Sequence, residues 1–235
     1  MNYAIIAAGE GSRLAAEGVL LPKPLVELDG KPMIGRLIDI FLSCSAESVS
    51  VIVNEQMTEV QEYLRALAPT LPVPLRLVVK STPSSMHSFA ELSAVMGAGR
   101  FILTTVDTIF RAEDFRRYVA AFQEAPDADG CMAVTSYIDD EKPLYVDVND
   151  RMEITAFRDE SRPGHDRFIS AGIYGLDDRA FATLRRCMDA GVSRMRNFQR
   201  ALLTDGLRLR AFDMGRVLDV DHAEDLRKAR EFVAG

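Results

Sequence analysis

The chain has 235 residues, of which 48% are hydrophobic and 27% charged, and it carries a net charge of −7 at pH 7. These proportions indicate a soluble globular protein with a sizeable core, organised as one elaborated domain rather than two. The acidic excess argues against a nucleic-acid-binding protein, because such a protein needs a broad basic face to displace counterions.

The first half of the chain alternates short apolar runs with amphipathic stretches. Apolar runs rich in Val, Ile and Leu predict buried strands, and apolar residues at helical spacing predict helices. The predicted strands cover residues 3–8, 49–53, 75–79 and 101–106, and the predicted helices cover residues 33–41, 58–67, 88–96 and 113–124. This alternation predicts βαβ units on a mostly parallel sheet.

After the fourth helix the spacing of the predicted strands shortens. Three strands follow in quick succession, with Asn149 and Asp150 as a hairpin turn between the last two. The predicted strands of this half cover residues 131–137, 145–148, 152–157, 169–174, 209–212 and 217–220, and the helices cover 179–190, 195–203 and 223–233. The sequence therefore predicts an α/β core followed by a small antiparallel elaboration.

A glycine-rich loop, residues 9–13, follows the first predicted strand, and Lys23 stands between two prolines ten residues after Arg13. Ligands bind at this edge of open α/β sheets, and glycines let successive backbone N–H groups converge on phosphate oxygens. Arg13 can bind a phosphate with two hydrogen bonds, and Lys23 adds a compact charge. Leu14 stands where a dinucleotide fingerprint needs its third glycine, and a Walker A loop is absent. The loop therefore predicts a triphosphate site, and the alternative is a tight turn with a surface arginine.

The string A-A-G-E-G-S-R-L at 7–14, followed by P-K-P-L at 22–25, resembles the nucleotidyltransferase superfamily that joins NTPs to sugar 1-phosphates, phosphocholine or acidic sugars. The resemblance spans nearly the whole chain. It implies a Rossmann-like three-layer α/β/α domain over residues 1–235, with a mixed, mostly parallel sheet. Residues 1–125 form the nucleotide-binding half and residues 126–235 the acceptor-binding half. It also implies attack of an acceptor phosphate on the α-phosphorus, with Arg13 and Lys23 stabilising the departing pyrophosphate.

Two aspartates complete the expected site. Asp107 ends an apolar strand at the ligand-binding edge, where it either caps a turn or faces a ligand. Asp221 and Glu224 have the spacing of a capping box, and Asp219 would face the same side as Asp221 on an extended strand. The resemblance implies that Asp107 holds Mg²⁺, although Val106 replaces the glycine usual before it, and favours Asp221 over Asp219 as the second ligand. Two carboxylates and phosphate oxygens suit Mg²⁺.

The segment 82–88 precedes a predicted helix, so one of its serines caps that helix, with Ser88 the favoured candidate. The resemblance implies that this loop covers the nucleobase, with Ser84 or Ser85 near its edge. Which base is accepted is left open.

The acceptor side departs from the family pattern. Residues 170–174 resemble its N-A-G-I-Y strand, with Ser170 in place of the asparagine, and Arg162 stands in the lysine position of its Glu-Lys-Pro motif. Three arginines near the predicted helix 195–203 either receive a phosphorylated acceptor or form a solvated helix face; they are Arg194, Arg196 and Arg200.

The three cysteines are widely spaced, so they match neither a disulfide framework nor a metal-binding motif. This use of cysteine is typical of a protein in a reducing compartment. The apolar run 3–8 is too short for a secretion signal, and no run approaches the roughly 20 apolar residues that cross a bilayer. We therefore expect a cytoplasmic protein without a nucleic-acid or membrane partner.

The sequence and the resemblance together predict a Mg²⁺-dependent nucleotidyltransferase that joins an NTP to a small phosphorylated acceptor, of the sugar 1-phosphate or phosphocholine type. A molybdopterin-type nucleotidyltransferase is the nearest enzymatic alternative. A non-catalytic nucleotide or sugar sensor is another, and the combined presence of two cations and two carboxylates argues against it. The expected site residues are Arg13, Lys23 and Asp107 for catalysis; Ala8, Gly9, Gly11, Ser12, Arg13, Lys23, Ser84 and Ser85 for the nucleotide; Asp107 and Asp221, or Asp219, for the metal; and Arg162, Ser170 and Gly172 for the acceptor.

Overall fold

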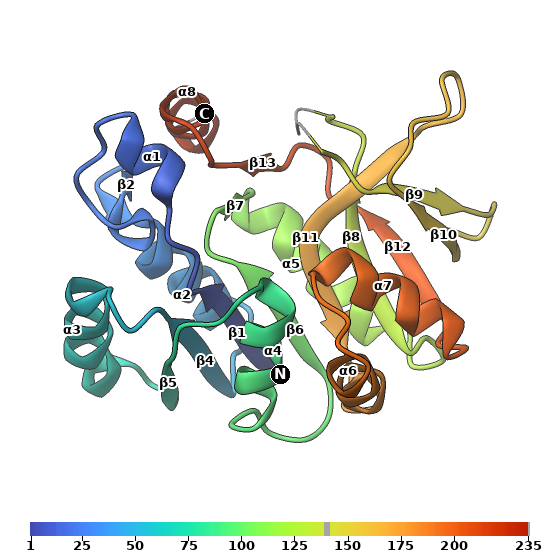
Figure 1. The fold of residues 1–235 in the computed structure, drawn as a ribbon, viewed down its shortest axis with the longest axis horizontal. Coiled ribbons are helices and arrows are strands. Elements are labelled where there is room, and N and C mark those ends of the chain that lie inside the picture. The colour runs from blue at the N-terminus through green and yellow to red at the C-terminus, as the bar shows by residue number, and fades with distance from the viewer. Residues whose placement is uncertain (139–141, 235) are drawn as a thin grey trace.

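The computed structural model describes residues 1–138 and 142–234, and its central element is strand β1 (Asn2–Ala7), from which a nine-stranded sheet extends to both sides (Figure 1). β1 pairs in parallel with β4 (Ser48–Val53) and with β6 (Phe101–Thr105), and β4 pairs in parallel with β5 (Leu75–Val79). β1 is apolar on both faces because both faces are covered by helices, as parallel strands require. All four strands match the predicted ranges to within a residue at each end.

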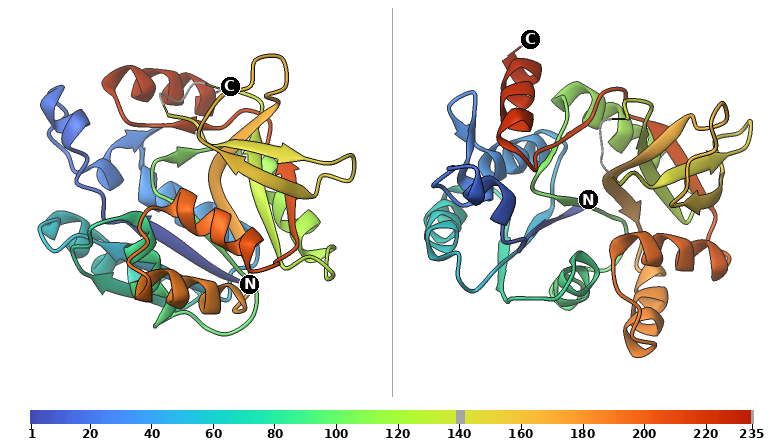
Figure 2. Two further views of the ribbon diagram at one scale, coloured as in Figure 1. Left: turned by 45° about the vertical axis from the view of Figure 1, so that its right-hand side comes forward. Right: turned by 45° about the horizontal axis from the view of Figure 1, so that its top comes forward.

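The second half of the sheet is mixed. β11 (Phe168–Leu176) runs antiparallel to β6, β8 (Gly130–Thr135) and β9 (Tyr145–Val148). β9 forms the predicted hairpin with β10 (Ile154–Arg158), which projects from the body of the domain (Figure 2), and β8 pairs in parallel with β12 (Leu209–Asp213). Of the nine strands in the described part of the sheet, only β10 and β11 run against the others. The prediction of a mixed, mostly parallel sheet with an antiparallel elaboration is confirmed.

Helices cover both faces of the sheet and enclose two hydrophobic cores. Successive side chains of a strand point to opposite faces, so Tyr3 and Ile5 enter one core while Ala4 and Ile6 enter the other. The first core also takes the buried faces of α2 (Met33–Ser43), α3 (Thr58–Leu67), α5 (Ala112–Gln123) and α8 (Ala223–Ala234). The second core takes those of α4 (Ser85–Ser93), α6 (Ala180–Asp189) and α7 (Met195–Thr204).

Helix α4 begins three residues earlier than predicted, and Ser88 is not its cap. Ser84 has extended backbone angles and is the N-cap residue, so the helix begins at Ser85. Met86 and Phe89 are both buried and extend the apolar face toward the N-terminus. Ser88 lies inside the helix, buried, with its Oγ 2.6 Å from the Thr82 Oγ1.

Several short elements were not predicted from the sequence. They are α1 (Ser12–Ala16), the 3₁₀ turn η1 (Lys23–Leu25), β2 (Glu27–Leu28), β3 (Lys31–Pro32), the turn η2 (Ala68–Thr70) and β7 (Thr108–Ile109). β13 (Leu218–Asp219) lies within the predicted strand 217–220. β7 and β13 pair antiparallel, which joins the end of β6 to the segment before α8. Among the described residues, no helix has the length and apolar character that a membrane span requires.

Candidate functional site

The loop after β1 turns sharply into α1. Gly11 at the start of α1 has φ +62°, and a Cβ atom there would lie 3.2 Å from the Lys23 Cβ. Glycine is therefore favoured at this position both by backbone conformation and by the close approach of Lys23. The loop forms one wall of a cavity of about 640 Å³, hereafter the larger cavity, which is lined by all eight residues expected to bind nucleotide: Ala8, Gly9, Gly11, Ser12, Arg13, Lys23, Ser84 and Ser85.

Four charged residues from distant parts of the sequence meet at the wall of the larger cavity. The Lys23 Nζ donates to the Asp107 Oδ2 at 2.6 Å and to the Asp221 Oδ1 at 2.9 Å. One guanidinium nitrogen of Arg13 donates to the other oxygen of Asp221 at 2.8 Å. The structure thus brings together the predicted cations and the predicted carboxylates, at the edge of the sheet where β1 and β6 end.

The electrostatics of this cluster depend on burial. The Lys23 side chain is only 8% exposed, and desolvation alone would lower its pKa, but the charges and hydrogen bonds of Asp107 and Asp221 outweigh desolvation and raise it. Burial likewise opposes the charge of Asp221, and Lys23 and Arg13 nevertheless hold the pKa of that carboxyl below its usual range. Lys23 and Asp221 therefore both stay ionised near neutral pH, and Lys23 keeps the positive charge that binding of an anion needs.

The side chain of Asp221 faces the cluster instead of capping α8. Its backbone N–H and that of His222 donate to the Asp225 Oδ2, at 3.1 and 2.8 Å, so Asp225, in the first turn of α8, accepts the backbone hydrogen bond that a capping box would assign to Glu224. Glu224, the other member of the expected capping box, pairs with Arg227 on its own helix. The capping-box alternative for Asp221 and Glu224 is therefore wrong.

Asp219 has a different position from Asp221. It lies in β13 and lines a second cavity of about 290 Å³, hereafter the smaller cavity, whereas Asp221 lines the larger one. Ser85 and Thr105 line both cavities, so the two adjoin there. Asp221 therefore lies with Arg13 and Lys23 in the larger cavity, and Asp219 lies in the smaller one.

The smaller cavity contains two of the three residues expected to bind the acceptor. Ser170 and Gly172 line it on β11, and the Ser170 Oγ donates to the Gln199 Oε1 at 3.2 Å. Gly172 has φ +71°, and a Cβ atom there would lie 2.9 Å from the Thr108 Oγ1. Only glycine fits this position without displacement of a neighbour. The β11–β8 register shifts between Ser170 and Tyr174, across this glycine.

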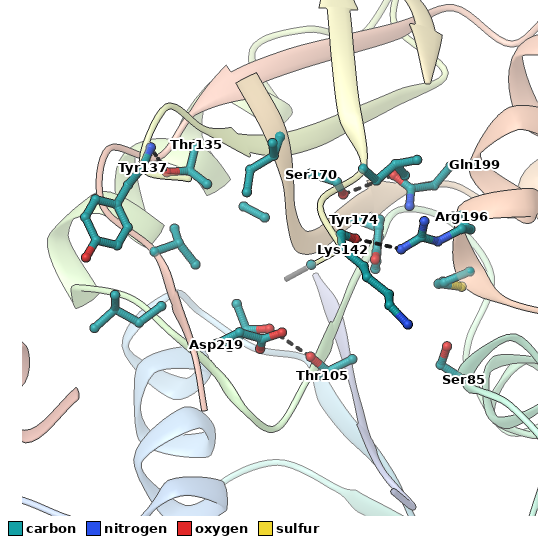
Figure 3. A pocket seen from close by; sticks show the side chains of 18 of the residues that line it. Ser85, Thr105, Thr135, Tyr137, Lys142, Ser170, Tyr174, Arg196, Gln199 and Asp219 are labelled. Carbon is teal, nitrogen blue, oxygen red and sulfur yellow. Dashed lines mark hydrogen bonds between the residues drawn. The ribbon is translucent and has the colours of Figure 1, made fainter. Parts of the chain in front are cut away.

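Cations and one buried phenol complete the smaller cavity. Figure 3 shows Arg196 and Gln199 of α7 on one side of it, close to Lys142 and Tyr174, with Asp219 and Thr105 across from them. Burial first, and then the charge of Asp219, raise the pKa of Tyr174, so its hydroxyl remains protonated and able to donate a hydrogen bond.

Arg162 is not among the described residues that line either cavity. Its side chain is 64% exposed and lies 3.5 Å from Asp147, so the structure does not bring it to the acceptor side. Arg200 is also absent from the described lining residues; it pairs with Asp159 and donates to the Phe157 carbonyl oxygen. Lys142 lines the smaller cavity.

The sequence analysis missed Lys142 as well as two amides of the larger cavity, Asn54 and Gln56. A signal for Asn54 exists, because it directly follows the buried strand β4 at the ligand-binding edge. A signal for Lys142 also exists, because residues 141–143 read Glu-Lys-Pro, the motif whose lysine position the sequence analysis gave to Arg162.

The family of the MobA-like NTP transferase domain matches residues 3–175. The chain belongs to this family. The resemblance to the nucleotidyltransferase superfamily, found from the phosphate-loop motif, is therefore confirmed.

Comparison with individual proteins agrees with this assignment. A 2-aminoethylphosphonate cytidylyltransferase of Lancefieldella rimae is 30% identical over 115 residues, which cover 48% of this chain and 45% of that protein. The aligned region thus spans less than half the length of that relative.

Solved structures share the fold. A protein assigned as a glucose-1-phosphate thymidylyltransferase from Bacillus anthracis, in complex with sucrose, has a TM-score of 0.85 at 20% identity, over 99% of this chain and 94% of that one. The inositol-1-phosphate CTP transferase from T. maritima has a TM-score of 0.80 at 18% identity, over 100% and 98%. The predicted Rossmann-like α/β fold is confirmed.

The donor atoms in this MobA-like domain suit Mg²⁺ bound together with phosphates. Within residues 1–138 and 142–234, no group of three or more His, Cys, Asp or Glu side chains is arranged to hold a metal ion. Asp107 and Asp221, however, both contact the Lys23 ammonium nitrogen. Their carboxylates are therefore close enough to contact one cation together. Mg²⁺ keeps several waters and takes phosphate oxygens, so two carboxylates are sufficient.

Proposed function

We propose that this protein is a Mg²⁺-dependent nucleotidyltransferase that joins an NTP to a small phosphorylated acceptor and releases pyrophosphate. The observation that supports this most is the meeting of two cavities beside the charged cluster. Arg13, Lys23, Asp107 and Asp221 line or flank the larger cavity, and the smaller cavity opens across Ser85 and Thr105. A nucleotide in the larger cavity would present its α-phosphate toward an acceptor in the smaller one.

The chemistry follows from the charges. An acceptor phosphate oxygen attacks the α-phosphorus, the bond between the α-phosphorus and the bridging oxygen breaks, and pyrophosphate leaves. The attacking oxygen is already anionic at neutral pH, so no general base is needed. Catalysis then consists of alignment and charge stabilisation. Lys23 and Arg13 would stabilise the leaving pyrophosphate, and Mg²⁺ held by Asp107 and Asp221 would neutralise charge on the phosphates.

The smaller cavity favours a small anionic acceptor. Arg194 and Arg196 line it at the start of α7, and Lys142 lines it next to Arg196, whose guanidinium donates to the Lys142 carbonyl oxygen at 2.9 Å. Arg194 is a non-glycine residue with φ +73°, a strained conformation of the kind that concentrates at ligand sites. Its backbone N–H donates to the Ser84 Oγ at 3.4 Å, which connects the two cavities. We assign the acceptor phosphate or phosphonate to these cations.

The similar proteins narrow the range of nucleotides and acceptors that we expect this protein to use. The three proteins compared above are named for cytidylyl, thymidylyl or CTP transfer, so we propose a pyrimidine NTP, with CTP first. The family match keeps a molybdopterin-type acceptor as a second candidate. A cavity of about 290 Å³ favours the smaller acceptors.

Pyrophosphate release tests the proposal. CTP, UTP, dTTP, ATP and GTP are each combined with Mg²⁺ and with glucose 1-phosphate, inositol 1-phosphate, phosphocholine or 2-aminoethylphosphonate. We expect turnover with one pyrimidine NTP and one acceptor, abolished by EDTA. Tight nucleotide binding by calorimetry without turnover in any combination would refute the enzyme and favour a nucleotide sensor.

A further inference from the structure

Glu17 connects the helix that follows the phosphate loop to the beginning of the last helix. It is the residue directly after α1, and its two carboxylate oxygens contact adjacent residues at the start of α8. The Ala223 backbone N–H donates to Oε2 at 2.6 Å, and the His222 Nδ1 lies 2.6 Å from Oε1. Figure 1 shows α1 and α8 next to each other, although about 200 residues separate them in sequence.

The residues held by Glu17 directly follow Asp221. Asp225, in the first turn of α8, accepts hydrogen bonds from the backbone N–H groups of both Asp221 and His222. The backbone of Asp221 and His222 is therefore hydrogen-bonded to the first turn of α8, which begins at Ala223. A contact that fixes Ala223 and His222 consequently fixes the backbone of Asp221 as well.

Glu17 also differs from the other link between α1 and this segment, the Arg13–Asp221 ion pair. Arg13 and Asp221 are 55% and 43% exposed, and exposed pairs contribute little to stability. Both side chains line the larger cavity, and the proposed function assigns them to phosphate and metal, so ligand binding would break the Arg13–Asp221 pair. Glu17 is not among the described residues that line either cavity, so its contacts are compatible with a bound nucleotide.

We propose that Glu17 is a positioning residue, which holds Asp221 against the phosphate loop when Arg13 and Asp221 turn to their ligands. The proposal rests on the nucleotidyltransferase function argued above. It assigns to Glu17 no contact with substrate. Substitution of a residue that orients a metal ligand without touching the metal lowers metal affinity or activity about 10- to 100-fold. We expect substitution of Glu17 to have an effect within that range.

The test compares Glu17→Ala with Glu17→Gln and with the control Glu224→Ala. Glutamine keeps an oxygen that can accept from the Ala223 N–H, whereas alanine removes both contacts. Glu224 is the residue after Ala223, and its carboxylate pairs with Arg227 of the same helix, so Glu224→Ala makes the same change in charge without breaking the link to α1. Steady-state kinetics are measured for the NTP and acceptor that the wild-type protein uses.

We expect Glu17→Ala to lower kcat/KM for the NTP about 10- to 100-fold and to leave KM for the acceptor unchanged. Glu17→Gln should stay within about threefold of the wild type, since it retains the bond to Ala223, and the control should match the wild type. A merely structural role would lower the Tm of Glu17→Ala without this split between the two substrates. Unchanged kinetics in Glu17→Ala, or equal losses in Glu224→Ala, would overturn the proposal.

A second measurement separates this proposal from the proposed function. Amide hydrogen exchange of segment 221–226, in the presence of Mg²⁺ and CTP, should be faster in Glu17→Ala than in the wild type or the control. If the wild type releases no pyrophosphate but binds CTP, the function is wrong, and faster exchange with weaker CTP binding in Glu17→Ala still supports the positioning role. Unchanged exchange contradicts that role, and absence of nucleotide binding by the wild type overturns both.

Discussion

Replacement of Lys23 by methionine separates the catalytic contribution of the charged cluster from its contribution to stability. Methionine keeps an unbranched apolar side chain in the same buried position but removes the ammonium group that contacts Asp107 and Asp221 at 2.6 and 2.9 Å. The two carboxylates then lose their shared partner. We expect a large loss of rate and a modest loss of stability.

The exposures of the three side chains set the magnitude for stability. Removal of one partner from a fully buried ion pair costs about 3–5 kcal/mol, and an exposed pair contributes about 0–1 kcal/mol. Lys23 is 8% exposed, but Asp107 and Asp221 are 22% and 43% exposed, so water can hydrate the carboxylates that remain. We expect a loss of about 1–3 kcal/mol, between those limits. At about 2–4 °C per kcal/mol for a chain of this length, the Tm falls by about 2–12 °C.

The expected loss of rate is larger than the loss of stability. A preorganised donor that stabilises developing charge contributes about 10²- to 10³-fold to kcat, or about 2.7–4 kcal/mol of transition-state stabilisation. Pyrophosphate release is measured well below the Tm of the variant, so that the protein is folded throughout the assay. Lys31→Met is the matched control, because Lys31 also pairs with an aspartate, Asp39, but on an exposed surface.

Two results would refute this reasoning. A rate within a few-fold of the wild type would show that the Lys23 charge is not used in the reaction. A Tm that falls far more than the expected range, with the remaining folded protein fully active, would make Lys23 a structural residue. An equal loss of rate in Lys31→Met would indicate a general effect of charge instead of a local one.

Three further predictions concern the metal and the acceptor side. Asp107→Asn should reduce Mg²⁺-dependent turnover at least about 100-fold with little change in Tm, and near-wild-type rates would contradict the metal assignment. Gly172→Ala should lower the Tm more than Gly191→Ala in thermal melts. Both glycines have φ near +70°, where an alanine costs about 1–2 kcal/mol, but of the two only Gly191 has open space for a Cβ atom. Arg194→Ala should raise KM for the acceptor while Arg200→Ala leaves it unchanged, and equal effects on KM would argue against the assigned phosphate contact.

The phosphate side could be predicted from sequence because its chemistry is local. Residues 9–23 contain the turn, the arginine and the lysine within one short segment, and the cavity they line was expected from the end of β1. Asp107 could be predicted for the same reason, since it follows a buried strand at the same edge. The spacing of Asp221 and Glu224 was misleading, because only the structure reveals that Asp225 makes the capping bonds.

Helix α4 shows a second limit of sequence reasoning. Each of Ser84, Ser85 and Ser88 has a side chain that can cap a helix. Ser84 is the N-cap because Met86 is buried and belongs to the apolar face of the helix, so the helix begins before Met86. Burial is a property of the packed structure. The apolar periodicity of residues 88–96 therefore predicted the helix correctly and placed its start three residues too late.

The acceptor side is harder to predict because no single segment forms it. The described residues of the smaller cavity come from α4, β6, β7, β8, β11, α7, β13 and α8 and from the loops next to them, and most of these elements contribute only one or two residues. Arg162 was assigned to the lysine position of the Glu-Lys-Pro motif but lies outside this cavity, whereas Lys142, the lysine of the Glu-Lys-Pro string at 141–143, lines it. Triphosphate binding requires a fixed set of backbone N–H groups and cations, which constrains a short sequence. Acceptor recognition can be changed by substitutions on any of these elements, so its specificity has to be derived from the assembled cavity.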